Sequence, residues 1–194
     1  MKYGNATLGQ VEAVWNKLGG EEGVQQLLSG TLVVVKAAIS SLLEEVGIVN
    51  LPSTGKFLAS DHFTTNSKEV KIAWIGENFQ NNFLGKVEDP QGKTTLRISK
   101  FKKNSLDQPI LDELGSKAET TLANIWELLK KQPNGQSGKL LTNGYVNIFY
   151  VRDAKGVLWA VGVHWSSGGW HVFACSVGHP HEWRGGHQVF SCNS

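Results

Sequence analysis

Histidine and tryptophan gather in the last third of the sequence, where the stretch HWSSGGWH spans residues 164–171. It holds His164, Trp165, Trp170 and His171 in mirrored order around four small residues. Imidazoles gain and lose protons near neutral pH and also bind metals, and indoles offer flat apolar surfaces for stacking. The stretch therefore combines groups that could bind a ligand or carry out acid–base chemistry.

A tight turn at Ser167–Gly168 would bring the two halves of this stretch into antiparallel pairing. Short polar and glycine-rich connections between apolar runs are typical of β-hairpins. Trp165 then faces Trp170 and His164 faces His171, and directly opposed residues lie on the same face of a sheet. The sequence thus predicts that the imidazoles project from one face and the indoles from the other.

The favoured hypothesis is a small non-enzymatic binding or interaction protein that uses this aromatic and His-rich hairpin surface. Residues 159–194 contain only Glu182 and Arg184 as formally charged side chains. A surface this neutral suits contact with a protein, a sugar or a base better than contact with phosphate. We expect the two indoles at the hairpin tip to protrude. No cofactor is expected, and the predicted binding residues are His164, Trp165, Trp170, His171 and Trp183.

A hydrolase, such as a nuclease, is the alternative function. His164 and His171 could act as a general acid and base, one imidazole giving a proton and the other taking one. Three further histidines lie in the stretch GHPHEWRGGH, and neutral imidazoles bind zinc or nickel. Their spacing matches no established zinc pattern. The candidate metal ligands are His179, His181, His187 and Glu182.

Nucleic-acid binding is a third possible function, and it rests on the stretch KTTLRISKFKK at residues 93–103. This segment is basic and contains no acidic residue. Cations interleaved with an aromatic ring can follow a phosphate backbone. The other interpretation is the solvent face of an edge strand, where lysine prevents edge-to-edge pairing. The candidate residues are Lys93, Arg97, Lys100, Lys102 and Lys103.

The composition is that of a folded protein, with 194 residues, 40% of them hydrophobic and 19% charged. A formal net charge of +2 predicts no polyanionic partner. No apolar run approaches the roughly 20 residues that span a bilayer, and the stretch MKYGNATLGQ lacks the apolar core of a signal peptide. We therefore expect a cytoplasmic protein in which Cys175 and Cys192 are free thiols.

The first 50 residues have helical patterns. Thr7 and Gln10 form a capping box that would begin a helix, and Gly19–Gly20 would end it. A second helix is expected over residues 21–29. The stretch TLVVV at 31–35 suits a buried strand or the start of the next helix, which the spacing predicts over residues 36–46. Residues 51–61 have the composition of a loop or linker.

Strand patterns dominate the remainder, with one helix predicted over residues 117–131 from a capping box at Ser116 and Glu119. Strands are expected at 69–76 and 94–101. The stretches YVNIFYVR, VLWAVGVHW, WHVFACSV and QVFSCN follow, and the turn DAKG would pair Tyr150 with Trp159. The predicted fold is α+β, with N-terminal helices, central helix 117–131 and a C-terminal antiparallel β-meander. The chain divides into 1–50 and 51–194, or forms a single domain, 1–194.

Several segments resemble one family of hypothetical bacterial proteins of the candidate-phylum type. These are LGQVEAVWNKLGG near the start, VKIAWIGENFQNNFL in the middle, and the long stretch from ILDELGSKAETTLANIW to GVHWSSGGWHV. The similarity covers most of the chain. It implies a bacterial protein and transfers no ligand, activity or site residue.

Overall fold

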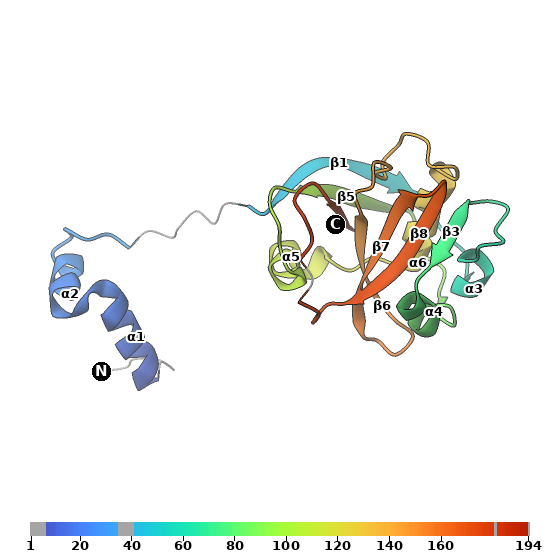
Figure 1. Ribbon diagram of the computed structural model, residues 1–194. Helices are drawn as coiled ribbons and strands as arrows, with labels where there is room; N and C mark the ends of the chain where they lie inside the picture. Colours follow the sequence, from blue (N-terminus) through green and yellow to red (C-terminus); the bar gives the residue numbers. More distant parts are fainter. Residues whose placement is uncertain (1–6, 35–40, 181, 194) are drawn as a thin grey trace. The chain divides into compact units, whose positions relative to one another are not determined.

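The computed structural model describes residues 7–34, 41–180 and 182–193 (Figure 1). The chain divides into two compact units, Met1–Ser40 and Ser41–Ser194. The first unit contains α1 (Leu8–Leu18) and α2 (Gly20–Leu28), and no residue of α1 is buried.

The predicted start and end of α1 are confirmed. The Thr7 side chain accepts a hydrogen bond from the Gln10 amide, and the Gln10 side chain accepts one from the Thr7 amide. Gly19 ends the helix with a φ of 89°, a left-handed conformation that costs glycine little. Neither of the two structures expected for residues 31–35, a buried strand or the start of a helix, is present at residues 31–34, and residue 35 lies outside the described part of the chain.

The second unit is built on a seven-stranded sheet with the order β1-β5-β9-β6-β7-β8-β3. The pairs β6–β9 and β3–β8 are parallel, and the other neighbours are antiparallel. The α+β class is confirmed, but the sheet is mixed and is not the expected antiparallel meander. Its strands are β1 (Leu43–Leu51), β3 (Ile72–Ile75), β5 (Thr94–Phe101), β6 (Asn147–Arg152), β7 (Leu158–Ser166), β8 (Gly169–Ser176) and β9 (Gln188–Cys192).

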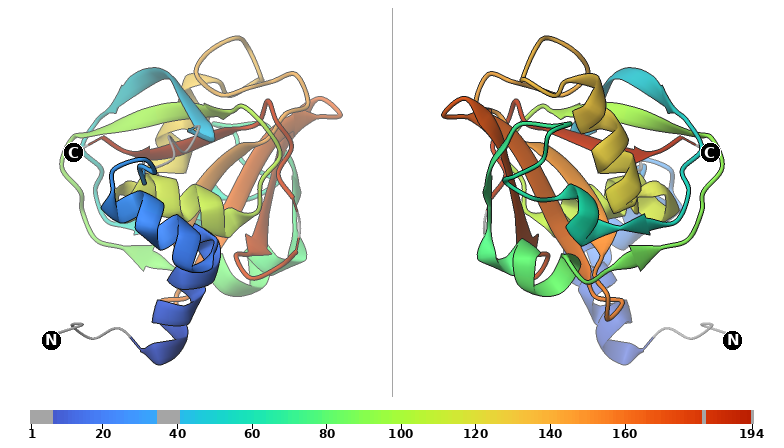
Figure 2. Two further views of the ribbon diagram at one scale, coloured as in Figure 1. Left: turned by 90° about the vertical axis from the view of Figure 1, so that its left-hand side faces the viewer. Right: turned by 90° about the vertical axis from the view of Figure 1, so that its right-hand side faces the viewer.

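Helices cover both faces of this sheet, because its central strands are apolar on both sides. Figure 2 shows α6 (Leu122–Lys131) against one face and α5 (Asp107–Leu114) against the other. The α6 face also packs on α3 (Ala59–His62) and α4 (Glu77–Phe83). A 3-10 turn, η1 (Gly115–Lys117), follows α5, and β2 (Phe57–Leu58) pairs with β4 (Val87–Glu88).

The helix expected over residues 36–46 is wrong where the structure describes it, because β1 begins at Leu43; residues 36–40 lie outside the described part. Its helical spacing is overridden by pairing with β5, which buries Leu43, Val49 and Leu51. A bulge between Glu45 and Gly47 interrupts the pairing. The segment 51–61, expected to be a loop, contains β2 and the start of α3.

The main helix begins later than the sequence predicts. α6 starts at Leu122 with a capping box formed by Thr121 and Asn124. The expected box at Ser116 and Glu119 is wrong. The carboxylate of buried Glu88 accepts hydrogen bonds from the Leu122 and Ala123 amides at 3.0 and 2.9 Å. A carboxylate at a helix N-terminus accepts hydrogen bonds from the free amides and interacts favourably with the positive end of the helix dipole. Glu88, which is distant in sequence, therefore helps to set where α6 starts.

The hairpin β7–β8 has the predicted register, with His164 opposite His171 and Trp165 opposite Trp170. The Trp residues lie on the α6 face and the His residues on the α5 face. Trp170 is fully buried, and its indole nitrogen donates to the Gln132 carbonyl at 2.8 Å. The expectation that Trp170 protrudes is therefore wrong, because the loop after α6 covers the hairpin tip.

The predicted pairing of β6 with β7 is wrong by one residue. Tyr150 lies opposite Ala160, and Val151 lies opposite Trp159. The cause is the turn, where the Asp153 carboxylate accepts hydrogen bonds from the Lys155 and Val157 amides and the Trp159 indole. A register shift of one residue moves every side chain of a strand to the other face of the sheet. Phe149 and Val151 therefore pack on the α6 face, and Ile148 and Tyr150 on the α5 face.

Gly135, in the loop after α6, packs closely on Trp165 of the hairpin, so a substitution there tests this packing. Its φ is 66°, and a Cβ there would lie 2.2 Å from the Trp165 ring. We predict that Gly135→Ala lowers the free energy of unfolding by about 3 kcal/mol, from left-handed strain plus overpacking. Gly144→Ala is the matched control, since Gly144 has a φ of 88° and open space around it; its loss should be about 1 kcal/mol. Urea denaturation measures both, and equal losses would contradict the proposed packing.

Candidate functional site

His164 and His171 form a cross-strand pair on the α5 face of the sheet. Their ring centroids lie 5.1 Å apart, with the rings tilted by 45°. Both side chains are partly buried. The buried Nδ1 of His164 and Nε2 of His171 have no hydrogen-bond partner within the described structure. A protein normally satisfies such groups, so this pair is an unusual feature of an otherwise well-bonded sheet.

Burial lowers the pKa of His164 below its ordinary value of 6.5, and the adjacent His171 imidazole lowers it further. Removal from water disfavours the charged form, and a second cation at this distance would repel it. His164 is therefore neutral at physiological pH, with one nitrogen carrying a proton and the other a lone pair.

Two aromatic side chains flank the pair. The Trp74 ring centroid lies 5.7 Å from that of His171, and Phe173 lies 5.8 Å from His164. We call the four residues Trp74, His164, His171 and Phe173 the imidazole–aromatic surface. Trp74 is 47% exposed although it belongs to a strand, and its neighbours Ile72 and Ile75 are buried.

Two glycines allow the aromatic rings to lie close to the backbone. A Cβ at Gly162 would meet the Phe173 ring at 2.4 Å, and a Cβ at Gly76 would meet the Trp74 ring at 2.9 Å. A hollow of about 300 Å³ adjoins these rings and is lined by Trp74, Gly76, Glu77, Asn78, Phe173 and Ala174. The arrangement offers a flat indole, neutral imidazoles and a small concavity side by side.

The indoles predicted to bind a partner do not lie on this surface. Trp165 and Trp170 lie on the opposite face of the hairpin, and their ring centroids are 5.5 Å apart. Trp183 lies on the α5 face but is buried, and its indole nitrogen donates to Asp107 Oδ1 at 2.7 Å. Burial removes Trp170 and Trp183 from any contact surface in this conformation. Of the five predicted binding residues, the structure brings together only the two histidines on a partly open face.

Sequence reasoning did not find Trp74, which belongs to β3 and precedes His171 by nearly 100 residues. It also missed Asp107, a buried carboxylate that accepts from the Tyr150 hydroxyl and the Trp183 indole, both at 2.7 Å. Burial and the Asp107 charge raise the pKa of Tyr150, so that hydroxyl stays protonated. Burial and Asp107 likewise raise the pKa of the Cys175 thiol, which makes that thiol a poor nucleophile.

The candidate metal ligands do not form a recognisable centre in the described structure. His181 lies outside it, and no group of three or more His, Cys, Asp or Glu side chains among the residues it describes is placed to hold a metal ion. His187 Nδ1 accepts a hydrogen bond from the Val146 amide at 2.8 Å, and His179 and Glu182 are exposed.

The basic segment 93–103 does not form one cationic face. Arg97 lies on the α5 face, where it pairs with Glu45. Lys100, three residues later in the same strand, lies on the opposite face of β5. β5 is bonded on both sides, by β1 and β9, so it is not the edge strand expected in the alternative interpretation. Lys93, Lys102 and Lys103 lie beyond the ends of the strand.

No family model, no curated protein and no solved structure matches this chain. Among the described residues, no helix has the length and apolarity that crossing a membrane requires.

The neutral state of His164 leads to a pH test. Because its folded pKa is lowered, the unfolded chain binds more protons just below pH 6.5, so stability falls as the pH drops through that value. We predict that His164→Gln makes this fall shallower, as measured by urea denaturation between pH 7.5 and 5.5. His62, whose pKa is also lowered by burial, should account for a separate part of it.

His179→Gln is the control, since His179 is exposed. It should keep the wild-type slope. A wild-type slope in His164→Gln would show that this imidazole is not held neutral by the fold.

Proposed function

We propose that the protein is a binding protein that takes a small, uncharged polar ring, a sugar or a heteroaromatic base, on the imidazole–aromatic surface. The observation that carries this is the pair of buried imidazole nitrogens that have no partner among the described residues, next to an indole that is left exposed. A ring stacked on Trp74 would cover this apolar area, and its polar groups would meet the imidazoles at the edge.

The charge of the surroundings favours a neutral ligand. Residues 159–194 carry Arg184 as their only formal cation, and the ring contacts of the two histidines are to Trp74 and Phe173. Phosphate recognition depends on several Lys or Arg contacts. This weighs against the nuclease alternative, for which the two imidazoles would need a bound phosphodiester between them.

The test is a titration of the full chain with monosaccharides and nucleosides, followed by NMR on the indole N–H and imidazole C–H signals. We predict that a bound ligand shifts the signals of Trp74, His164 and His171. Trp74→Ala should weaken binding about tenfold or more, because base–aromatic stacking contributes about 1–3 kcal/mol.

Trp15→Ala is the matched control, as Trp15 is 44% exposed and lies in α1. It should bind as the wild type does. If no sugar or nucleoside shifts these signals, or if both variants weaken binding equally, the proposal fails. Cleavage of labelled RNA by the wild type but not by His164→Ala would favour the hydrolase instead.

A further inference from the structure

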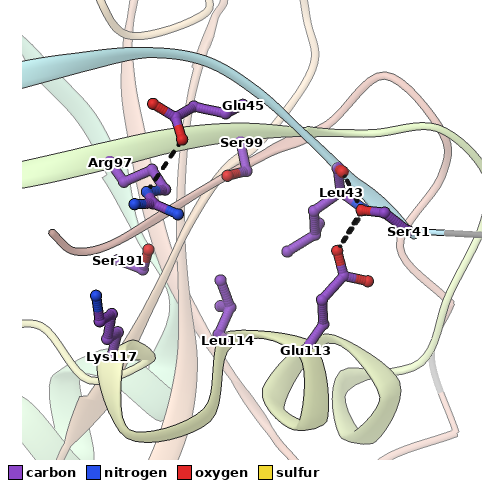
Figure 3. Close-up of a pocket in the computed structure, with 9 residues that line it drawn as sticks. All are labelled: Ser41, Leu43, Glu45, Arg97, Ser99, Glu113, Leu114, Lys117 and Ser191. Carbon is purple, nitrogen blue, oxygen red and sulfur yellow. Dashed lines mark hydrogen bonds and ion pairs between the residues drawn. The ribbon is translucent and has the colours of Figure 1, made fainter.

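A polar pocket of about 410 Å³ lies on the α5 face at the opposite end of the sheet from the imidazole–aromatic surface (Figure 3). Three strands, β1, β5 and β9, form its floor, and α5 and η1 form its wall. It is lined by Ser41, Leu43, Glu45, Arg97, Ser99, Glu113, Leu114, Lys117 and Ser191.

Two buried serines line this pocket. Ser99 is 4% exposed and Ser191 is 2% exposed, and neither hydroxyl makes a hydrogen bond to any residue that the structure describes. Ser99 lies opposite Glu45 in the sheet, and Ser191 lies opposite Arg97, so all four side chains share one face. Neither hydroxyl oxygen is among the described atoms that are buried without a partner, so both oxygens can be reached from the pocket. Two pocket-facing hydroxyls with no protein partner among the described residues are free to bond a ligand.

Two cations lie beside these hydroxyls. Arg97 donates to Asn193 Oδ1 and pairs with Glu45 at 3.2 Å. Lys117 Nζ makes one long hydrogen bond, 3.4 Å, to the Asn193 carbonyl, and within the described part of the chain no carboxylate lies within 4 Å of it. Figure 3 shows Arg97, Lys117 and Ser191 together at one end of the pocket.

The other end of the pocket is occupied by Glu113, whose carboxylate is already engaged (Figure 3). It accepts hydrogen bonds from the Ser41 hydroxyl and from the Leu42 and Leu43 amides at 2.6, 2.8 and 3.1 Å. Burial would raise the pKa of Glu113, but these three bonds lower it below its ordinary value. Glu113 therefore stays charged and ties α5 to the start of β1, which fixes the shape of the pocket.

We propose that this pocket binds the carboxylate of a small organic acid or of a free peptide C-terminus. The carboxylate would accept hydrogen bonds from Lys117, Ser99 and Ser191 and from the free edge of the Arg97 guanidinium. Charge-assisted bonds of this kind are the stronger ones. Leu43 and Leu114 offer apolar contacts for the attached hydrocarbon. Glu45 pairs with Arg97, which leaves Lys117 as the pocket cation without a carboxylate partner among the described residues, so a single negative charge fits better than a phosphate dianion.

Isothermal titration and NMR of the full chain test this proposal with hexanoate, hexanamide, inorganic phosphate, and a short N-acetylated peptide ending in a free or an amidated C-terminus. We expect hexanoate, the free-acid peptide or both to bind, and neither amide to bind. The two acids distinguish a free metabolite-like acid from a chain terminus. Failure of both acids, equal binding of acid and amide, or preference for phosphate would each overturn the proposal.

The matched variants are Lys117→Gln and Lys100→Gln, which remove one lysine from the pocket and one from the opposite face of β5. Lys117→Gln should weaken carboxylate binding about tenfold or more, in line with the loss of a hydrogen bond to a charged group, and Lys100→Gln should leave it unchanged. Equal effects would point to general charge attraction and contradict the site.

The variant Ser99→Ala/Ser191→Ala separates a binding role from a structural one. If the hydroxyls serve the ligand, this variant should keep the melting temperature of the ligand-free protein and lose about tenfold or more in affinity. A lower melting temperature with unchanged affinity would show that the hydroxyls serve the fold. This result does not depend on the imidazole–aromatic surface.

Discussion

The register of the β7–β8 hairpin is the constraint on which the rest of the second unit depends. Its two-residue turn has positive φ at both Ser167 (50°) and Gly168 (75°), the geometry whose twist matches that of paired strands. A shift of one residue would turn His164 and His171 into the apolar core and bring Trp170 to the surface. The fully buried Trp170 and its hydrogen bond to the Gln132 carbonyl oppose that shift, so the hairpin is fixed by its turn and by its packing together.

A hairpin that is apolar on both faces must be covered on both. α6 supplies one cover, and its own start is held by the Glu88 carboxylate from the small β2–β4 sheet. α5 and the loop after β8 supply the other cover. There Asp107 accepts from Tyr150 on β6 and from Trp183 in the loop, so one buried carboxylate joins a helix, a strand and a loop. Burial of a charge is tolerated when it is hydrogen-bonded in this way.

The sequence predicts those parts of the fold that depend on neighbouring residues. The α1 capping box and the strands from 94–101 and 147–176 follow from local pattern, and so does the pairing of His164 with His171. Prediction from the sequence fails where a residue distant in the chain determines the local structure. Glu88 moves the start of α6, β5 converts a helical pattern into β1, and the Asp153 turn shifts β6 by one residue. The parallel pairs β6–β9 and β3–β8 join segments with no local signal, so the mixed sheet could not be foreseen.

The candidate sites divide in the same way. Two histidines of the imidazole–aromatic surface follow from hairpin symmetry, but Trp74 reaches it through a parallel strand from the middle of the chain. The serines of the polar pocket carry no sequence signal at all, because a strand serine is ordinary until a neighbouring helix encloses it in a pocket.

Both candidate sites lie on the α5 face, at opposite ends of one sheet. The order β1-β5-β9-β6-β7-β8-β3 places the polar pocket over the first three strands and the imidazole–aromatic surface over the last three. Between them, β6 carries Tyr150 and Ile148 under the cover that contains α5 and Trp183. That cover satisfies its buried polar groups through Asp107, whereas at the β7–β8 end two imidazole nitrogens are buried with no partner among the described residues. At the other end, the hydroxyls of Ser99 and Ser191 face the pocket and make no hydrogen bond to a described residue. These polar groups are the ones that the two proposed ligands would satisfy.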